Sequence, residues 1–236
     1  MTGIQMFKHG IDQEALIGKF SEATAKQGEA IRKAVTEATL KALQGRELSL
    51  TNIKQVLSTV AKAASTGAAG SALPSADVET LLAKAVAGMD TALEQAVQAN
   101  RKALQQMVDQ GATLRETQVK KALADIEKME DTLFAALRKA AEGSQASVEG
   151  PWANVLNAAQ GKGTSTGAQA NATITQLMDS AQKNLRDGRS LGLRASQAMF
   201  DSYSTLVSGV LIGMSDALQQ GGAAPPAARS SPSRKK

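Results

Sequence analysis

Residues 199–218 read MFDSYSTLVSGVLIGMSDAL and form the most apolar segment of the chain. Large apolar side chains recur there every three or four residues, a spacing that places them along one face of an α-helix. We call this face the C-terminal stripe, and it comprises Phe200, Tyr203, Leu206, Val207, Val210, Leu211, Met214 and Leu218. The stripe predicts either the anchor of a helical core or a surface that binds another apolar body.

Two glycines, Gly209 and Gly213, lie four residues apart beside the stripe. This spacing lets two helix backbones approach closely, either within one bundle or between two chains. Ile212 widens the apolar face, and Asp201 and Asp216 are the only charged residues of the segment. The segment therefore lacks the Lys/Arg-rich polar face that is typical of helices binding anionic lipid. Both interpretations of the stripe, core and interface, stay open at this point.

The composition of the whole chain extends the helical pattern outward from this segment. Apolar residues make up 42% of the 236 residues, but aromatic residues only 3%, and 43 residues are alanine. Alanine has the highest helix propensity and buries little surface, so such a chain forms helices readily and packs them thinly. Runs of β-branched and aromatic residues, which favour strands, are missing. We predict an all-α fold, an elongated antiparallel bundle of four to five helices with a disordered C-terminal tail.

Punctuating residues divide the chain into five regions. We predict a flexible N-terminus at 1–11 and a helical region at 12–142, with one helix at about 12–44 and a second at 50–65 capped by Ser49. Gly111 is a candidate break in the long run 76–142. A weak internal repeat relates about 12–66 to 78–142. A linker at 143–167 holds a short helix at 151–160, a long amphipathic helix spans 168–220, and residues 221–236 form the tail.

The net charge of +5 belongs to the tail rather than to the body of the protein. Four cations lie in the last eight residues, and without them 23 basic residues face 22 acidic ones. These cations are Arg229, Arg234, Lys235 and Lys236. A dedicated nucleic-acid binder carries a basic stripe on its folded domain, so we expect at most weak, salt-sensitive contact with nucleic acid through this tail.

No residue pattern indicates catalysis, a metal site or a cofactor. The chain has no cysteine, and its one histidine, His9, has no ligand cluster around it. The segment GKGTSTG at 161–167 lacks the residue order and the preceding strand of a phosphate-binding loop, so we interpret it as a flexible linker. No apolar run approaches the length of a transmembrane helix, and no signal-peptide pattern opens the chain. The expected location is the cytoplasm.

Trp152 is the only tryptophan and follows Pro151 in the predicted short helix. Two interpretations fit it. A tryptophan at this position closes one end of a bundle, or it anchors a protein partner, because tryptophan is enriched at binding hot spots.

The amphipathic style of the chain resembles the phasins, the helical proteins that coat polyhydroxyalkanoate storage granules in bacteria. The resemblance covers about residues 12–220 and is carried by segments such as EATAKQGEAIRKAVTEATLKALQ at 22–44 and ANRKALQQMV at 99–108. The missing cysteines, the scarce aromatics and the short tail AAPPAARSSPSRKK at 223–236 are also similar. No diagnostic motif accompanies it, so the resemblance implies a manner of binding and assigns no functional residue.

Three functions follow as hypotheses. The first is a non-enzymatic protein that lays amphipathic helices on a hydrophobic body such as a storage granule. The second is a helical scaffold or adaptor that self-associates, as a homo-oligomer, or binds another protein. The third is a nucleoid-associated helical protein that acts through its basic tail.

Overall fold

A computed structural model describes residues 11–44, 48–109, 117–186 and 206–216. These residues are almost entirely helical, which confirms the all-α prediction. Their helices outnumber the four to five expected, because several predicted helices are divided into shorter ones. The elements are α1 (Gln13–Ser21), a 3-10 turn (Ala25–Gln27), α2 (Gly28–Gln44), α3 (Leu50–Ala69), α4 (Ser75–Asp109), α5 (Thr117–Glu127), α6 (Met129–Glu142), α7 (Ala146–Lys162), α8 (Ser165–Arg186) and a helical segment at 206–216.

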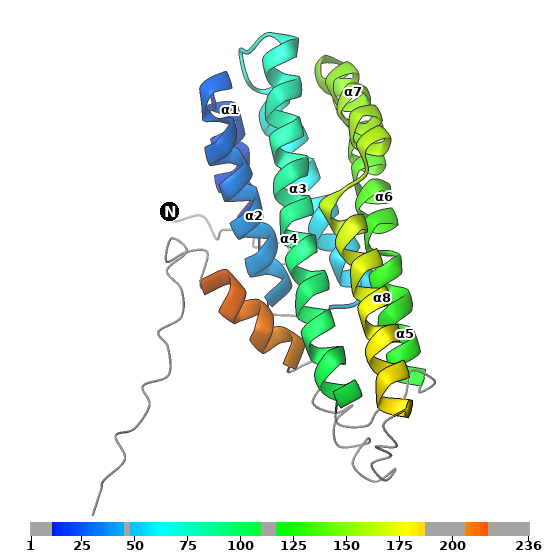
Figure 1. Ribbon diagram of the computed structural model, residues 1–236. Helices are drawn as coiled ribbons and strands as arrows, with labels where there is room; N and C mark the ends of the chain where they lie inside the picture. The colour runs from blue at the N-terminus through cyan, green and yellow to red at the C-terminus, as the bar shows by residue number, and fades with distance from the viewer. Residues whose placement is uncertain (1–10, 45–47, 110–116, 187–205, 217–236) are drawn as a thin grey trace, which may run out of the picture.

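The helices form an elongated bundle of two layers (Figure 1). In one layer α4 lies in the middle and packs along α2 on one side and α8 on the other. In the second layer α3 lies in the middle and packs along α1 and α6. The helix α4 also packs against α7, and the interfaces it makes with α2 and α8 differ in chemistry.

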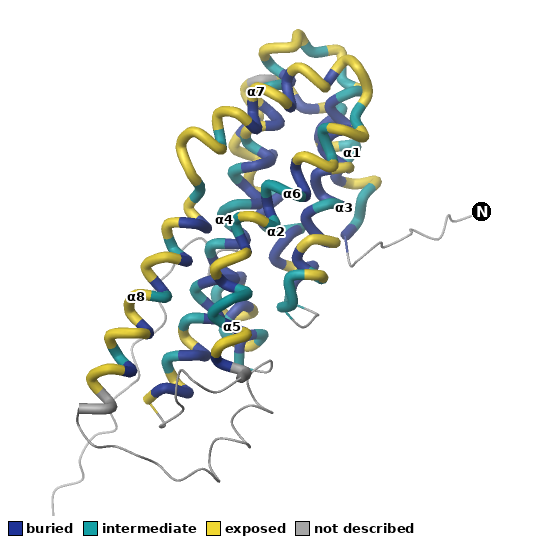
Figure 2. The backbone as a smooth tube through the Cα atoms, turned by 90° about the vertical axis from the view of Figure 1, so that its right-hand side faces the viewer, coloured by how far each residue is buried: buried dark blue, intermediate teal, exposed yellow. Residues whose placement is uncertain are grey.

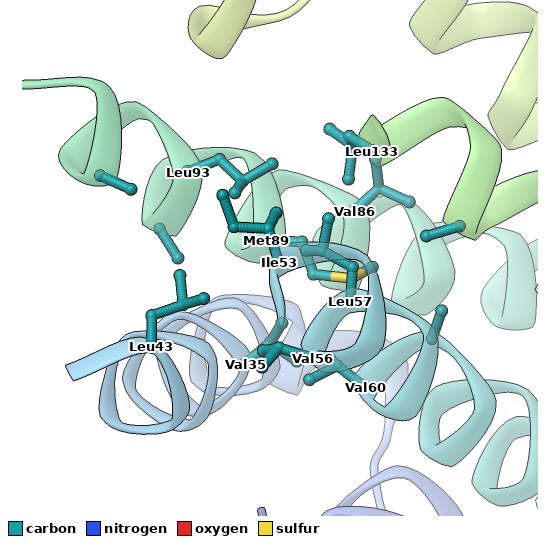
Figure 3. Close-up of a cluster of buried hydrophobic side chains, with 14 of the residues drawn as sticks. Val35, Leu43, Ile53, Val56, Leu57, Val60, Val86, Met89, Leu93 and Leu133 are labelled. Carbon is teal, nitrogen blue, oxygen red and sulfur yellow. The ribbon is translucent and has the colours of Figure 1, made fainter. Parts of the chain in front are cut away.

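The core lies between the two layers and consists mainly of aliphatic side chains. Figure 3 shows its centre, where residues of α2, α3, α4 and α6 meet. The labelled side chains are Val35, Leu43, Ile53, Val56, Leu57, Val60, Val86, Met89, Leu93 and Leu133. Alanines fill much of the remaining space, with Ala61, Ala64, Ala92 and Ala96 fully buried. The small size of alanine allows the helices to lie close together.

The predicted single helix at 12–44 is interrupted after Ser21. Thr24 begins a 3-10 turn, and the side chain of Gln27 accepts a hydrogen bond from the backbone N–H of Thr24 at 2.9 Å. This Thr-x-x-Gln arrangement is a capping box, which marks a helix start. The sequence contains this capping box, but the apolar periodicity continues across Thr24 and by itself predicts one uninterrupted helix. The flexible N-terminus was predicted to extend to residue 11, but Ile11 is buried in the core, so the ordered part begins earlier than expected.

Two further boundaries differ from the sequence predictions. The helix α3 begins after Ser49 as expected, with the serine Oγ accepting from the N–H of Asn52, but it continues to Ala69. The expected linker at 143–167 is largely helical, because α7 extends the predicted helix 151–160 at both ends. Pro151 was expected at the first helical position but is the sixth residue of α7, so α7 lacks one backbone hydrogen bond there, the one that an N–H at 151 would donate to the carbonyl of Ser147.

The run 76–142 contains α4, α5 and α6. Gly111 falls outside the described residues, so its role as a break stays a prediction. A second break occurs at Lys128, between α5 and α6. The interruption at 22–24 has no counterpart 66 residues later, since 88–90 lie inside the unbroken helix α4. The internal repeat therefore has no support from the positions of these breaks.

Within the part of the chain described, no helix is long and apolar enough to cross a membrane. Of the predicted long helix 168–220, the structure describes α8, which begins slightly earlier, at Ser165, and a separate helical segment at 206–216. The residues between them lie outside the described ranges, so the single helix stays a prediction. Most of the N-terminal segment and the whole of the tail lie outside the described residues, and so does the histidine at position 9.

Candidate interaction surface

The interface between α4 and α8 is lined by polar pairs in a constant register. Arg101 donates from Nη1 to the side-chain oxygen of Gln176 at 2.6 Å. One turn further, the hydroxyl of Ser180 donates to the side-chain oxygen of Gln105 at 3.3 Å. Both pairs join residues 75 positions apart. The helices α4 and α8 therefore run in the same direction, side by side.

The start of α8 is fixed by two carboxylates from other helices. Asp90 of α4 accepts hydrogen bonds from the backbone N–H groups of Ser165 at 2.8 Å and Thr166 at 2.9 Å. Glu130 of α6 accepts from both the N–H and the hydroxyl of Thr164. Negative charge at a helix N-terminus satisfies the free N–H groups and interacts favourably with the helix dipole. The joint between α7 and α8 is therefore held in place.

This joint corrects the interpretation of GKGTSTG as a flexible linker. Gly163 adopts a positive φ of 71° and ends α7, and Thr164 caps α8 by accepting from the N–H of Gly167 at 3.0 Å. A Cβ at Gly167 would lie 2.3 Å from a carboxylate oxygen of Glu130, so a larger residue there would displace this carboxylate. The N–H groups that a phosphate would need are already occupied by carboxylates.

Beyond the joint, α8 is attached mainly through small or polar side chains. Of its side chains that the structure describes, Leu177 is the one large apolar group that is fully buried. Ile174 is half-buried, and Met178, on the same side of the helix, is 55% exposed. The other buried residues are Thr166, Gly167, Ala170, Thr173 and Ala181. Figure 2 shows the long exposed face of α8 along one side of the bundle.

The C-terminal stripe is divided between the core and the surface. In the segment 206–216, Val207 and Leu211 are buried in the main core cluster, as the core interpretation predicts. Leu206, Val210 and Met214 are half-buried. The remaining members of the stripe, Phe200, Tyr203 and Leu218, lie outside the described residues.

The outer side of the segment 206–216 presents apolar surface to solvent. Ile212 is 44% exposed, and Gly209 and Gly213 are exposed on either side of it. A Cβ at either glycine would meet no atom within 4 Å, so these glycines do not serve close packing inside this bundle. Of the two interpretations of this glycine spacing, contact between two chains therefore stays a prediction.

Trp152 is not an exposed anchor. Its side chain is fully buried, and its indole N–H donates to the hydroxyl of Ser65 on α3 at 2.8 Å. Ser65 in turn donates to the carbonyl of Ala61 at 2.9 Å. A buried indole needs such a partner for its N–H group. Trp152 thus joins α7 to α3 inside the bundle, which corrects its assignment as a candidate partner anchor.

The described charged residues form no cluster that could hold a metal ion. The strongest electrostatic feature is an ion pair between α2 and α4, where the ammonium of Lys84 donates to the carboxylate of Glu29. This hydrogen bond and the charge of Lys84 lower the pKa of Glu29, with a smaller contribution from Arg32. The pair is solvent-exposed and joins helices, so it has the geometry of a structural contact.

The chain matches a family over residues 6–220, nearly its full length. It belongs to the family of unknown function DUF6781. No curated protein and no solved structure matches it. The family assignment carries no activity or partner, so the functional argument depends on the α4–α8 interface and the segment 206–216.

Sequence reasoning missed Asp90 and Glu130, the two residues that fix the joint. Each lies in a helix remote in sequence from residues 164–166, and each resembles an ordinary solvated carboxylate. The available signal was Thr164 with Ser165 after Gly163, a pattern typical of a helix end followed by a new N-cap. That pattern predicts free N–H groups but does not identify the carboxylates that bind them.

Proposed function

We propose that this protein is a non-enzymatic surface-binding protein that covers a hydrophobic body, such as a polyhydroxyalkanoate granule, with amphipathic helices. The observation that carries the proposal is the weak apolar attachment of α8 to the bundle. Its amphipathic face buries one large side chain, Leu177, and leaves Met178 exposed beside it. In this proposal α8 turns away from α4 about its fixed N-terminal joint and lays this face on the surface.

The exchange is favourable because a surface offers more burial than α4 does. Burying a large aliphatic side chain stabilises by about 1.5–3 kcal/mol. In the closed bundle only Leu177 is fully buried, whereas the side chains of Ile174 and Met178 remain partly exposed to water. A flat apolar surface can bury all three side chains together. For the side chains of α8 alone, the difference is therefore about one to two side chains in favour of the surface.

The face of α4 that α8 leaves behind includes polar groups. It presents Asp90, Arg101 and Gln105 to α8, and each of them can hydrogen-bond to solvent. The Nε atom of Arg101 is buried without a hydrogen-bond partner in the closed bundle. Opening this interface would satisfy that donor, which lowers the cost of the movement.

The second candidate function, a scaffold that self-associates or binds a protein, is favoured by the outer side of the segment 206–216. The exposed Ile212 lies between two glycines that no other part of the described bundle covers. This candidate requires no opening of the bundle. The third hypothesis, nucleoid association through the basic tail, concerns residues outside the described ranges and stays a prediction.

Charge placed on α8 tests the first proposal. Met178→Glu puts a carboxylate on the amphipathic face at a position already exposed, so the closed bundle should stay intact. Ala172→Glu places the same charge on the same helix at an exposed position outside that face. The binding measurement is co-sedimentation of each full-length protein with polyhydroxybutyrate particles, with lipid vesicles and protein alone as controls.

We expect the wild-type protein and Ala172→Glu to pellet with the polymer, and Met178→Glu to pellet several-fold less. Equal pelleting of both variants would contradict a binding role for this face. Pelleting of none of the proteins, together with a dimeric mass that Ile212→Glu converts to a monomer, would favour the scaffold.

A further inference from the structure

An open groove runs along the opposite layer of the bundle, between α1, α3 and α6. Its main hollow has a volume of about 500 Å³, and a second hollow of about 330 Å³ adjoins it. The two share Ser58, Lys62, Thr66 and Lys139, so they form one continuous groove. Volumes of this size are typical of small-molecule sites.

Three lysines line this groove, and none of its described lining residues is an aspartate or glutamate. Lys54 and Lys62 come from α3, and Lys139 comes from α6 on the other side. Eight residues separate the two α3 lysines, which places their backbones about 12 Å apart along the helix. This concentration of positive charge is notable because the body of the protein carries nearly equal numbers of cations and anions.

Like most of the described lysines, the groove lysines have no carboxylate partner among the described residues. Elsewhere, Lys33 pairs with Glu37 at 3.9 Å, and Lys121 pairs with Asp125 at 2.8 Å. No ion pair within the described ranges involves any of the three groove lysines. Their positive charge is therefore available to a bound anion.

Hydroxyl groups in the groove supply further donors. Thr59 and Ser65 donate to carbonyls of their own helix, those of Gln55 and Ala61. No such bond within the described residues engages the hydroxyl of Ser58 or Thr66, although both line the groove. Free hydroxyls beside ammonium groups can complete the hydrogen bonding of phosphoryl oxygens.

We propose that this groove binds a small anion that carries two or more phosphoryl groups. An extended anion matches the spread of the lysines along the groove, where the backbones of Lys54 and Lys62 lie about 12 Å apart. The ammonium groups neutralise the anion, and the hydroxyls of Ser58 and Thr66 donate to its oxygens. The site does not depend on the surface-binding role, because it lies on the α1–α3–α6 layer and α8 forms no part of it.

The test uses inorganic tripolyphosphate and the full-length protein, with affinity measured by isothermal titration calorimetry at low ionic strength. The double variant Lys62→Gln, Lys139→Gln removes two groove cations and leaves the helices intact. A matched variant, Lys102→Gln, Lys183→Gln, removes two exposed cations outside the groove. A third, Lys235→Gln, Lys236→Gln, removes the same charge from the tail.

We expect saturable binding of tripolyphosphate by the wild-type protein and a Kd at least about tenfold higher for the groove variant. The two control variants should change the Kd by less than about twofold. Tripolyphosphate should also protect Lys62 and Lys139 from reductive methylation, as read by mass spectrometry. Absence of saturable binding, equal losses in groove and control variants, or sulfate binding as tightly as tripolyphosphate would overturn the proposal.

Discussion

The two sides of α4 hold their neighbours in different ways. Toward α2 the contact combines polar pairs with close aliphatic packing: α2 buries Ile31, Val35, Leu40 and Leu43 within 17 residues. Toward α8 the contact is about as extensive but has fewer large apolar groups, and among the described large apolar side chains of α8 only Leu177 is fully buried. At about 1.5–3 kcal/mol for each large aliphatic side chain, the burial within α2 exceeds that within α8 about fourfold.

The backbones of α2 and α4 also lie very close together. A Cβ at Gly88 of α4 would lie 2.6 Å from the carbonyl oxygen of Arg32 and 3.0 Å from Val35, so α2 lies directly against α4. The hydroxyl of Thr36 also donates to the carbonyl of Gly88 at 3.1 Å. In the proposed function, α2 stays on one side of α4 while α8 leaves the other. Helical content alone does not distinguish these two neighbours.

The largest expected effect comes from comparing a methionine-to-alanine substitution in the core of α4 with the same substitution on α8. Met89→Ala, in the core of α4, should lower the free energy of unfolding by about 2–5 kcal/mol, because it leaves a cavity among fully buried side chains. Met178→Ala, on the exposed side of α8, should change it by less than about 0.5 kcal/mol. Urea unfolding followed by circular dichroism measures both. Equal losses would show that α8 is as firmly packed as the core.

A smaller effect is expected at the close contact between α2 and α4. Gly88→Ala should destabilise the protein by about 1–3 kcal/mol, because the new methyl group meets the backbone of Arg32. Gly161→Ala serves as the control, since a Cβ there meets nothing within 4 Å and lies inside α7. That control should stabilise by about 0.4–1 kcal/mol. Thermal unfolding measures both variants. An unchanged stability of Gly88→Ala would contradict the close approach of α2 to α4.

The third prediction concerns the joint that fixes the start of α8. Asp90→Ala removes the acceptor of two backbone N–H groups and should cost about 0.5–2 kcal/mol. Hydrogen exchange should increase at residues 165–168 and remain unchanged in α2 and α3. Asp179→Ala removes an exposed carboxylate of α8 and is the control. Uniform acceleration throughout the bundle would contradict a local role for Asp90.

The smallest effect is a pH dependence at the α2–α4 interface. The contact with Lys84 holds the pKa of Glu29 below its ordinary value of 4.5. The folded state therefore gains stability from ionised Glu29 above pH 4.5, and this gain is lost as the pH falls through the lowered pKa. The unfolding midpoints of wild type and Glu29→Gln should differ near neutral pH and converge in acid. A constant difference would exclude this linkage.

The sequence predicted the helical class and much of the core, because alanine content and apolar periodicity depend on local spacing. Val207 and Leu211 were identified in this way, as members of a stripe that could be core. The break before Thr24 was missed because the periodicity runs through it, although a local capping signal was present. Trp152 was ambiguous because its partner, Ser65, lies 87 residues away and carries no recognisable pattern.

The candidate surfaces were harder to predict than the fold. Whether Met178 is exposed depends on which helices flank α8, and periodicity does not determine that arrangement. Similarly, the groove lysines come from α3 and α6, which are adjacent only in space. Residues such as Asp90, which stabilise a distant helix start, cannot be distinguished in sequence from solvated carboxylates.

Locking one interface of α4 at a time tests the central claim, that α8 leaves α4 to bind a hydrophobic surface. The chain has no cysteine, so two introduced thiols can be joined specifically by a short bismaleimide. Gln105→Cys with Ser180→Cys locks α8 to α4, and Arg32→Cys with Thr91→Cys locks α2 to α4, each pair replacing a hydrogen-bonded contact. Each cross-linked protein is compared with its unlinked form by co-sedimentation with polyhydroxybutyrate particles. We predict that the α4–α8 lock abolishes pelleting and that the α2–α4 lock leaves it unchanged. Undiminished pelleting of the α4–α8 locked protein would contradict the account.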